Sequence, residues 1–179
     1  MEVNKLKFTR LQGGLFRMLC IKAGEPLTQF EAAKAIGASQ TAVSKALGPL
    51  VREGLAKVEK KHGRLFIELD RESRKATELK MTENLRMVFE SGLVPAMEEK
   101  FPGAAIILFG SYSRGEDTMK SDIDIAVVGS KQKAVYLGRF EKQLGRDINL
   151  QFYDSFKSID KELKENILSG ILLAGRIEL

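Results

Sequence analysis

Two short groups of residues in the second half of the chain could do chemistry together. Gly110 and Ser111 follow an apolar run, and ten residues after them Asp122 and Asp124 open another. Glycine allows the backbone to approach a ligand closely, and alternate residues of a strand share one face, so the two carboxylates are expected side by side. Paired carboxylates suit a hard cation such as Mg²⁺. A phosphate-binding turn that faces a carboxylate pair indicates a metal-dependent nucleotide site.

This pattern resembles the nucleotidyltransferase superfamily that includes polymerase beta, and in particular its minimal nucleotidyltransferase branch, which has Gly-Ser, ten residues and Asp-x-Asp. The resemblance covers residues 104–128 and extends weakly to the end of the chain. It implies that Asp122 and Asp124 are catalytic and ligate Mg²⁺ in a two-metal site. The substrate or ligand is then a nucleoside triphosphate.

The turn that begins at Gly110 carries the groups expected to bind this nucleotide. Backbone N–H groups after Gly110 point into a loop-to-helix start, which favours phosphate oxygens. Ser111 adds a hydroxyl donor, and Arg114 can hold a phosphate through its planar fork. Gly110, Ser111 and Arg114 are therefore the predicted nucleotide-binding residues.

The resemblance also implies a third carboxylate on the next strand, within an apolar-Asp-apolar triplet. The best-aligned triplet here has Asn149 at its centre, between Ile148 and Leu150. Asp147 lies on the same face two residues earlier, roughly 6.6–7 Å away along the strand. It either takes the third catalytic position or is an ordinary charge at the start of a strand. Asparagine brings no charge and cannot serve as a base, so the site either transfers nucleotides or only binds them.

The first half of the chain has the pattern of a winged helix. One helix is followed by a second, which Thr28 and Glu31 start through a capping box. Ser39 can cap a third, and two alternating runs around residues 61–63 predict a hairpin. The order of three helices and a hairpin resembles many prokaryotic winged-helix transcription regulators, roughly over residues 8–70.

In such a module the third helix lies in the major groove of double-stranded DNA. The resemblance implies that outward residues of this helix meet base edges, while basic residues nearby meet phosphates. The DNA-binding residues predicted in this way are Gln40, Thr41, Ser44 and Lys45 for bases and Arg52, Lys60, Lys61 and Arg64 for phosphates. His62, at the tip of the hairpin, is expected to be an exposed turn residue. The alternative is a module for dimerisation or protein docking.

The charge of the chain is divided unevenly. Residues 1–80 carry 16 Lys and Arg against 9 Asp and Glu, net +7, whereas residues 81–179 carry 13 against 15, net −2, which together give the +5 of the whole chain. A basic first half indicates contact with a polyanion, although a solvated basic face has the same signature. The sequence has no apolar run long enough to span a membrane, no signal-peptide pattern and a single cysteine, Cys20. The chain is therefore expected in the cytoplasm, without a membrane partner.

The expected fold class is α/β, or α+β overall, with an N-terminal winged helix-turn-helix followed by a small mixed-sheet nucleotidyltransferase-like domain. The predicted division is a DNA-binding domain at residues 1–70, a connector helix at residues 71–93 and the second domain at residues 94–179. The connector has one apolar side, which pairs with its twin in a homodimer or packs against its own domains. Helices are predicted at residues 131–144 and 155–168, on either side of a strand.

Three functions fit these patterns. The first is a DNA-binding protein with a Mg²⁺-dependent nucleotidyltransferase domain that moves a nucleoside monophosphate from a triphosphate to an unknown acceptor. The resemblance includes relatives that adenylylate a partner toxin, which implies a HEPN-type protein partner. The second is a winged-helix transcription regulator whose second domain only binds or senses a nucleotide, and Asn149 favours it. The third is an antitoxin-like interaction module that uses neither chemistry.

Overall fold

The computed structural model describes residues 7–61 and 63–178, so the prediction for His62 lies outside the described residues. The chain divides into two compact units, Met1–Lys80 and Met81–Leu179, and each unit has a hydrophobic core of its own. Within the described ranges, no helix has both the length and the apolar character needed to cross a membrane.

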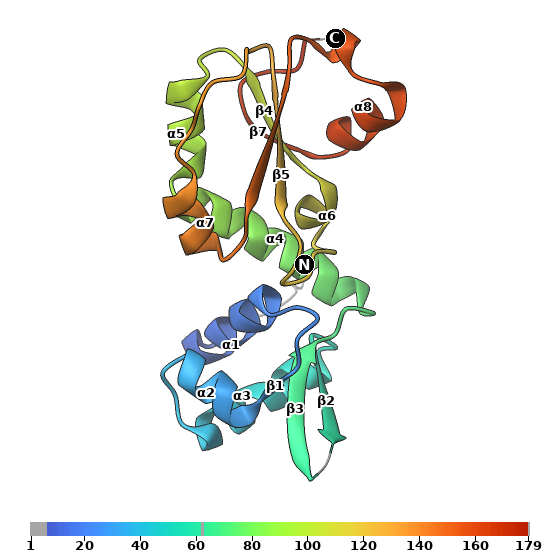
Figure 1. Ribbon diagram of the computed structural model, residues 1–179. Helices are drawn as coiled ribbons and strands as arrows, with labels where there is room; N and C mark the ends of the chain where they lie inside the picture. The colour runs from blue at the N-terminus through green and yellow to red at the C-terminus, as the bar shows by residue number, and fades with distance from the viewer. Residues whose placement is uncertain (1–6, 62, 179) are drawn as a thin grey trace. The chain divides into compact units, whose positions relative to one another are not determined.

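The first unit has the element order predicted for a winged helix. Three helices pack together, and a β-hairpin follows them (Figure 1). The sheet order is β1-β3-β2 with antiparallel pairing throughout. The two-residue strand β1 was not predicted, and it completes the sheet by pairing with β3. The elements are α1 (Arg10–Ile21), β1 (Leu27–Thr28), α2 (Gln29–Ala35), α3 (Gln40–Arg52), β2 (Ala56–Lys61) and β3 (Arg64–Leu69).

The predicted caps set the starts of these helices. The N–H of Thr28 donates to Glu31 Oε2 at 2.7 Å, and the N–H of Glu31 donates to Thr28 Oγ1 at 3.2 Å, which confirms the capping box of α2. Ser39 caps α3, accepting a hydrogen bond from the N–H of Ala42. The apolar stripe of α3 is buried, so its other face is left outward: the buried residues are Val43, Ala46, Leu47 and Leu50.

The predicted connector corresponds to helix α4, Arg74–Glu90. Residues spaced by four along it are buried: Ala76 belongs to the core of the first unit and Val88 to a core of the second. The division between the two units falls inside this helix. Gly92, with φ of 75°, takes the left-handed conformation that separates α4 from α5 (Leu93–Lys100).

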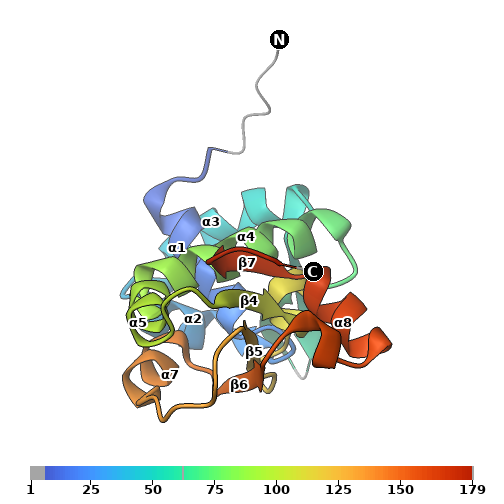
Figure 2. The same ribbon diagram turned by 90° about the horizontal axis from the view of Figure 1, so that it is seen from above.

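The second unit is a small mixed sheet covered on both faces, as the expected α/β class requires. Its order is β6-β5-β4-β7, with β5 and β6 parallel and the other pairs antiparallel. Helices α5 and α7 pack on one face and α8 on the other (Figure 2). The elements after α5 are β4 (Ala105–Phe109), α6 (Gly110–Arg114), β5 (Ile123–Val128), α7 (Gly138–Leu144), β6 (Ile148–Tyr153), the 3₁₀ turn Phe156–Ser158, α8 (Lys161–Leu168) and β7 (Ile171–Ala174).

Both helices predicted beside β6 are shorter than expected. The first was predicted from residue 131 but begins at Gly138. Val135 and Leu137 pack against the core while Tyr136 between them is 83% exposed, which is the alternation of an extended segment. The second, predicted from residue 155, begins at Lys161 after the 3₁₀ turn.

Candidate functional site

The outward face of α3 carries the residues predicted to read DNA. All four predicted base-contacting residues are exposed, and so are the four basic residues predicted to meet phosphates. The first set is Gln40, Thr41, Ser44 and Lys45, and the second is Arg52, Lys60, Lys61 and Arg64. In the second set, Lys61 contacts Glu59 at 2.7 Å, and this neighbouring carboxylate raises the pKa of the Lys61 ammonium.

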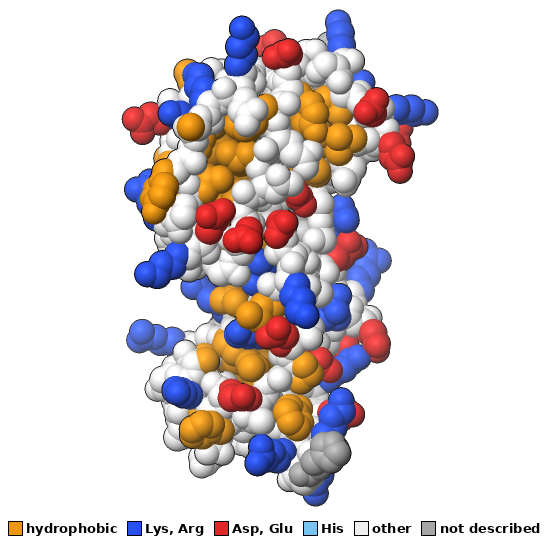
Figure 3. All heavy atoms as spheres, in the orientation of Figure 1, with side chains coloured by type: hydrophobic (Ala, Val, Ile, Leu, Met, Phe, Trp, Pro, Cys, Tyr) orange, Lys and Arg blue, Asp and Glu red, His pale blue; other side chains and the backbone are white. Residues whose placement is uncertain are grey.

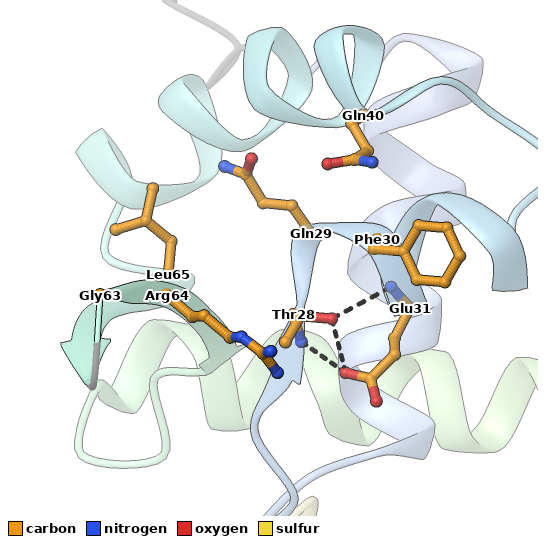
Figure 4. Close-up of a pocket in the computed structure, with 8 residues that line it drawn as sticks. All are labelled: Thr28, Gln29, Phe30, Glu31, Gln40, Gly63, Arg64 and Leu65. Atoms are coloured by element: carbon orange, nitrogen blue, oxygen red, sulfur yellow. Dashed lines mark hydrogen bonds between the residues drawn. The ribbon is translucent and has the colours of Figure 1, made fainter.

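A pocket of about 640 Å³ lies between the first turns of α2 and α3 and the hairpin (Figure 4). Two of the residues predicted to contact DNA line it, Gln40 and Arg64. Gln29 and the ring of Phe30, which is 61% exposed, line it as well, and neither was predicted from the sequence. Hydrogen bonds from the backbone and side chain of Thr28 lower the pKa of Glu31 in this pocket, with a smaller contribution from the charge of Arg64.

In the second unit, Gly110 and Asp124 are in direct contact. Strand β4 ends at Phe109, which pairs with Asp124 of β5, so the turn at Gly110 begins beside this carboxylate. A Cβ at residue 110 would lie 2.7 Å from Asp124 Oδ2, and the φ of 73° at this position also favours glycine. The structure therefore brings the glycine of the Gly-Ser turn and an aspartate of the Asp-x-Asp pair together.

The two aspartates differ in their surroundings. Asp124 is half-buried and Asp122 is exposed. Asn149 Nδ2 donates a hydrogen bond to Asp124 Oδ1 at 3.0 Å. Among the described residues, Asp122 makes no side-chain hydrogen bond or ion pair. In the space-filling view, acidic side chains gather near the end of the second unit at which β5 and β6 begin (Figure 3).

The parallel pairing of β5 and β6 sets Asn149 opposite Asp124, the position predicted for a third carboxylate. Asp147 precedes β6, is exposed, and lines with Asp122 a pocket of about 380 Å³. Over residues 7–61 and 63–178, no three Asp, Glu, His or Cys side chains are grouped as ligands for one metal ion. Asp122, Asp124 and Asp147 thus do not form a single cluster of three.

Helix α6 holds the remaining predicted nucleotide-binding residues. Ser111 is half-buried on its first turn, and no side chain caps the start of this helix. The guanidinium of Arg114 is exposed and contacts Glu116 at 2.8 Å and Asn166 Oδ1 at 3.3 Å, so it lies between α6 and α8. Ser121, in the loop before β5, accepts a hydrogen bond from the N–H of Thr118 at 3.0 Å and shapes that loop.

The comparison with protein families decides what this unit is. The nucleotidyltransferase domain family matches residues 91–173. These residues are a nucleotidyltransferase domain.

One curated relative of the chain is a protein of Methanocaldococcus jannaschii that is named, provisionally, as a protein adenylyltransferase. It is 55% identical over 38 residues, which are 20% of this chain and 38% of the relative. The match therefore spans well under half the length of that relative.

The solved structures similar to the chain are winged-helix proteins. They include the adhesin competence repressor AdcR from Streptococcus pyogenes (23% identity, 53% of this chain and 69% of that one, TM-score 0.42). A mutant of ZitR from Lactococcus lactis has 20% identity, covering 56% of this chain and 66% of that one, with a TM-score of 0.42. MepR from S. aureus, in a complex with DNA, has 23% identity, 52% and 77% coverage and a TM-score of 0.38. Because these scores are low, the winged-helix assignment rests on the order of elements described above.

A buried polar network beside helix α6 was not predicted. Asn84 Nδ2 donates to the backbone oxygen of Tyr112 at 2.9 Å and to Asp117 Oδ1 at 2.7 Å. The other oxygen of Asp117 lies 3.5 Å from Arg146 Nη2, and the side chains of this pair are 0% and 3% exposed. The network ties α4 to α6 and to the loop that leads to Asp122. One signal was available, since Asn84 falls four residues before the buried Val88 on the inward side of a helix.

Proposed function

We propose that the nucleotidyltransferase domain transfers a nucleoside monophosphate from a triphosphate to an acceptor hydroxyl and releases pyrophosphate. The observation that supports this most is the contact of Gly110 with Asp124, because it places an acidic side chain against the Gly-Ser turn. Backbone N–H groups at the uncapped start of α6, with the Ser111 hydroxyl, would bind phosphate oxygens. Arg114, on the last turn of α6, would neutralise phosphate charge. Its guanidinium would leave Glu116 and contact the phosphate instead.

The donor set of this domain fits Mg²⁺. Asp122 and Asp124 offer carboxylate oxygens, and a protein site for Mg²⁺ commonly has one or two carboxylates, with phosphate and water oxygens completing the shell. A bound Mg²⁺ would neutralise triphosphate charge and activate the acceptor hydroxyl. Asp122 and Asp124 would hold the ion, and Asp147, exposed beside Asp122 in one pocket, would accept the acceptor's proton. The two-metal arrangement stays a prediction.

The proposed acceptor is a hydroxyl-bearing side chain of a protein. The support is the name of the relative from Methanocaldococcus jannaschii, which matches over 38 residues. A HEPN-type partner, a homodimer and a cytoplasmic location remain predictions from the sequence.

Transfer is tested by incubating the chain with labelled nucleoside triphosphates, Mg²⁺ and a cell lysate. The double variant Asp122→Ala/Asp124→Ala should label nothing, while Glu98→Ala/Glu99→Ala, which removes two exposed carboxylates from α5, should label as the wild type does. Equal labelling by the wild type and the aspartate variant would exclude transfer at this site.

We further propose that the winged helix binds double-stranded DNA through α3 and the hairpin. Two features support this role. The residues predicted to contact bases are exposed on the first two turns of α3, and the hairpin carries Lys60, Lys61 and Arg64. Gln40 of α3 and Arg64 of the hairpin line the same pocket, so these two surfaces are adjacent. A single DNA duplex could therefore contact both. Gln29 and Phe30 would then contact DNA as well.

The second candidate is a regulator whose nucleotidyltransferase domain senses a nucleotide without turnover. Asn149 favours it, because an amide stands at the position where a third carboxylate was predicted. A triphosphate that raises the melting temperature of the chain while no label is transferred to any acceptor would support this function over catalysis.

A further inference from the structure

Asp124 is fixed from two sides. Its Oδ2 atom lies 2.7 Å from the position that a Cβ of residue 110 would take, so Gly110 leaves room for the carboxylate in this orientation. Its Oδ1 atom accepts the amide hydrogen of Asn149 at 3.0 Å from the neighbouring strand. Because β5 and β6 pair in register at these two residues, the sheet holds the backbone of Asn149 opposite that of Asp124. Asp122, in contrast, is exposed and, within the described ranges, has no partner of this kind.

An amide donor and a carboxylate have opposite effects at this position. A carboxylate about 3 Å from Asp124 would repel it and would need a cation between the two. The amide of Asn149 instead donates a hydrogen bond to Asp124 and adds no negative charge. An amide at residue 149 therefore needs no cation between it and Asp124.

We infer that Asn149 is a positioning residue that takes the place of a resident cation beside Asp124. The nucleotidyltransferase domain then keeps no divalent ion of its own and takes up its ion together with the triphosphate, whose phosphate oxygens supply the missing negative ligands. This inference rests on the proposed nucleotide site and specifies when the ion enters it.

The test measures the binding of Mn²⁺ by electron paramagnetic resonance, with the full chain, in the presence and absence of a non-hydrolysable triphosphate. Three proteins are compared: the wild type, Asn149→Asp and Gln151→Glu. The last is a matched control, because residue 151 is two positions along the same face of β6 and gains the same charge. Melting temperatures in a chelator and in Mn²⁺ are recorded for each protein.

The wild type should bind Mn²⁺ weakly alone and more tightly with the triphosphate. Asn149→Asp should bind Mn²⁺ alone tighter than the wild type by about tenfold or more, because a third carboxylate joins the pair. It should also melt at a lower temperature than the wild type in the chelator and recover when Mn²⁺ is added. Gln151→Glu should follow the wild type.

Tight binding of Mn²⁺ by the wild type without a triphosphate would overturn the inference, as would an unchanged Mn²⁺ affinity in folded Asn149→Asp. If Asn149→Asp does not fold in either buffer, the melting temperature of Asn149→Ala tests the inference instead. Loss of its amide donor should lower the melting temperature in the chelator, and an unchanged value would overturn the inference.

The inference and the proposed function fail in different ways. If the triphosphate alters neither Mn²⁺ binding nor melting of the wild type, the proposed function fails, and with it the uptake of the ion with the nucleotide. The role of Asn149 beside Asp124 is still decided by the arm without nucleotide.

Discussion

At residue 110 a side chain would displace the carboxylate of Asp124. A Cβ here would lie 2.7 Å from Asp124 Oδ2, closer than van der Waals contact, so glycine allows this carboxylate to lie beside the turn. Elsewhere in the same unit, Gly103 has a similar backbone with φ of 81°, but nothing lies within 4 Å of the position that its Cβ would take. Comparing substitutions at Gly103 and Gly110 therefore separates the free-energy cost of a left-handed backbone from the cost of a steric clash with Asp124.

Gly110→Ala should therefore destabilise the chain more than Gly103→Ala. The latter carries only the strain of a left-handed alanine, about 1 kcal/mol. The former also displaces the carboxylate of Asp124, so about 2 kcal/mol in total is expected, together with loss of triphosphate binding. Urea denaturation and a nucleotide-binding titration measure the two effects. Equal loss of stability in both variants would contradict the contact with Asp124.

The sequence predicted that these residues lie near one another better than it predicted their contacts. The spacing of Gly110, Asp122 and Asp124 was enough to place the turn and the acidic pair at the same end of the sheet. The hydrogen bond from Asn149 to Asp124 joins residues that are 25 positions apart and depends on the register of two strands, which local pattern does not encode.

At the scale of elements, a capping box fixes the start of α2 beside the pocket of the winged helix. Its hydrogen bonds hold the pKa of Glu31 below its ordinary value, with Thr28 as the main cause. A carboxylate with a lowered pKa in the folded state contributes stability above its unfolded pKa, and this contribution is lost as pH falls through the folded pKa.

The wild type should thus lose stability as the pH falls below the ordinary range for a glutamate, and part of this loss should be absent from Glu31→Gln. Thr28→Val removes the side-chain hydroxyl of the capping box and should reduce the same part of the pH dependence. Urea denaturation at a series of pH values measures it. A Glu31→Gln profile parallel to that of the wild type would show that the capping box is not formed in solution.

The second element-scale feature is the buried network that joins α4 to α6. Asn84→Ala removes the donor to Asp117 and to the backbone of Tyr112, leaving buried acceptors without it. A loss of about 2–4 kcal/mol in unfolding free energy is expected. Arg86→Ala on the same helix breaks two ion pairs in which the arginine side chain is 52% exposed and should cost about 0.5 kcal/mol or less. Similar losses in the two variants would contradict the network.

Most helices and strands followed from periodicity and caps, and the exceptions have physical causes. Residues 131–137 have no proline or glycine and favour a helix locally, but Val135 and Leu137 are both drawn to the core, which an extended segment allows. Strand β1 is two residues long, too short for an alternating pattern to reveal it. The contacts of Asn84 were not predicted, because its partners lie 28 and 33 residues away in the sequence.

For the whole molecule, the division of charge coincides with the division into units. The unit at residues 1–80 carries net +7 and the unit at residues 81–179 carries net −2. A polyanion is therefore expected to bind the winged helix rather than the nucleotidyltransferase domain. The uneven charge can be read from the sequence alone. The place at which the units divide lies within α4, and no residue pattern in that helix marks it.

The double variant Lys60→Ala/Lys61→Ala should weaken DNA binding and reduce the slope of log K against log salt by about two. The control Lys157→Ala/Lys161→Ala removes two exposed lysines from the other unit and should keep the slope of the wild type. Fluorescence anisotropy with a labelled duplex over a series of salt concentrations measures both. An unchanged slope in the first variant would remove the hairpin from the proposed interface.

The opposition of Asn149 and Asp124 across β6 and β5 has an evolutionary consequence. Asparagine and aspartate codons differ only in their first base, so one transition in the gene would exchange the neutral amide for an acid. Such a mutant would gain a metal ligand and lose stability when starved of divalent ions. Laboratory evolution toward faster turnover should recover this single substitution early, and mostly in media rich in Mg²⁺ or Mn²⁺.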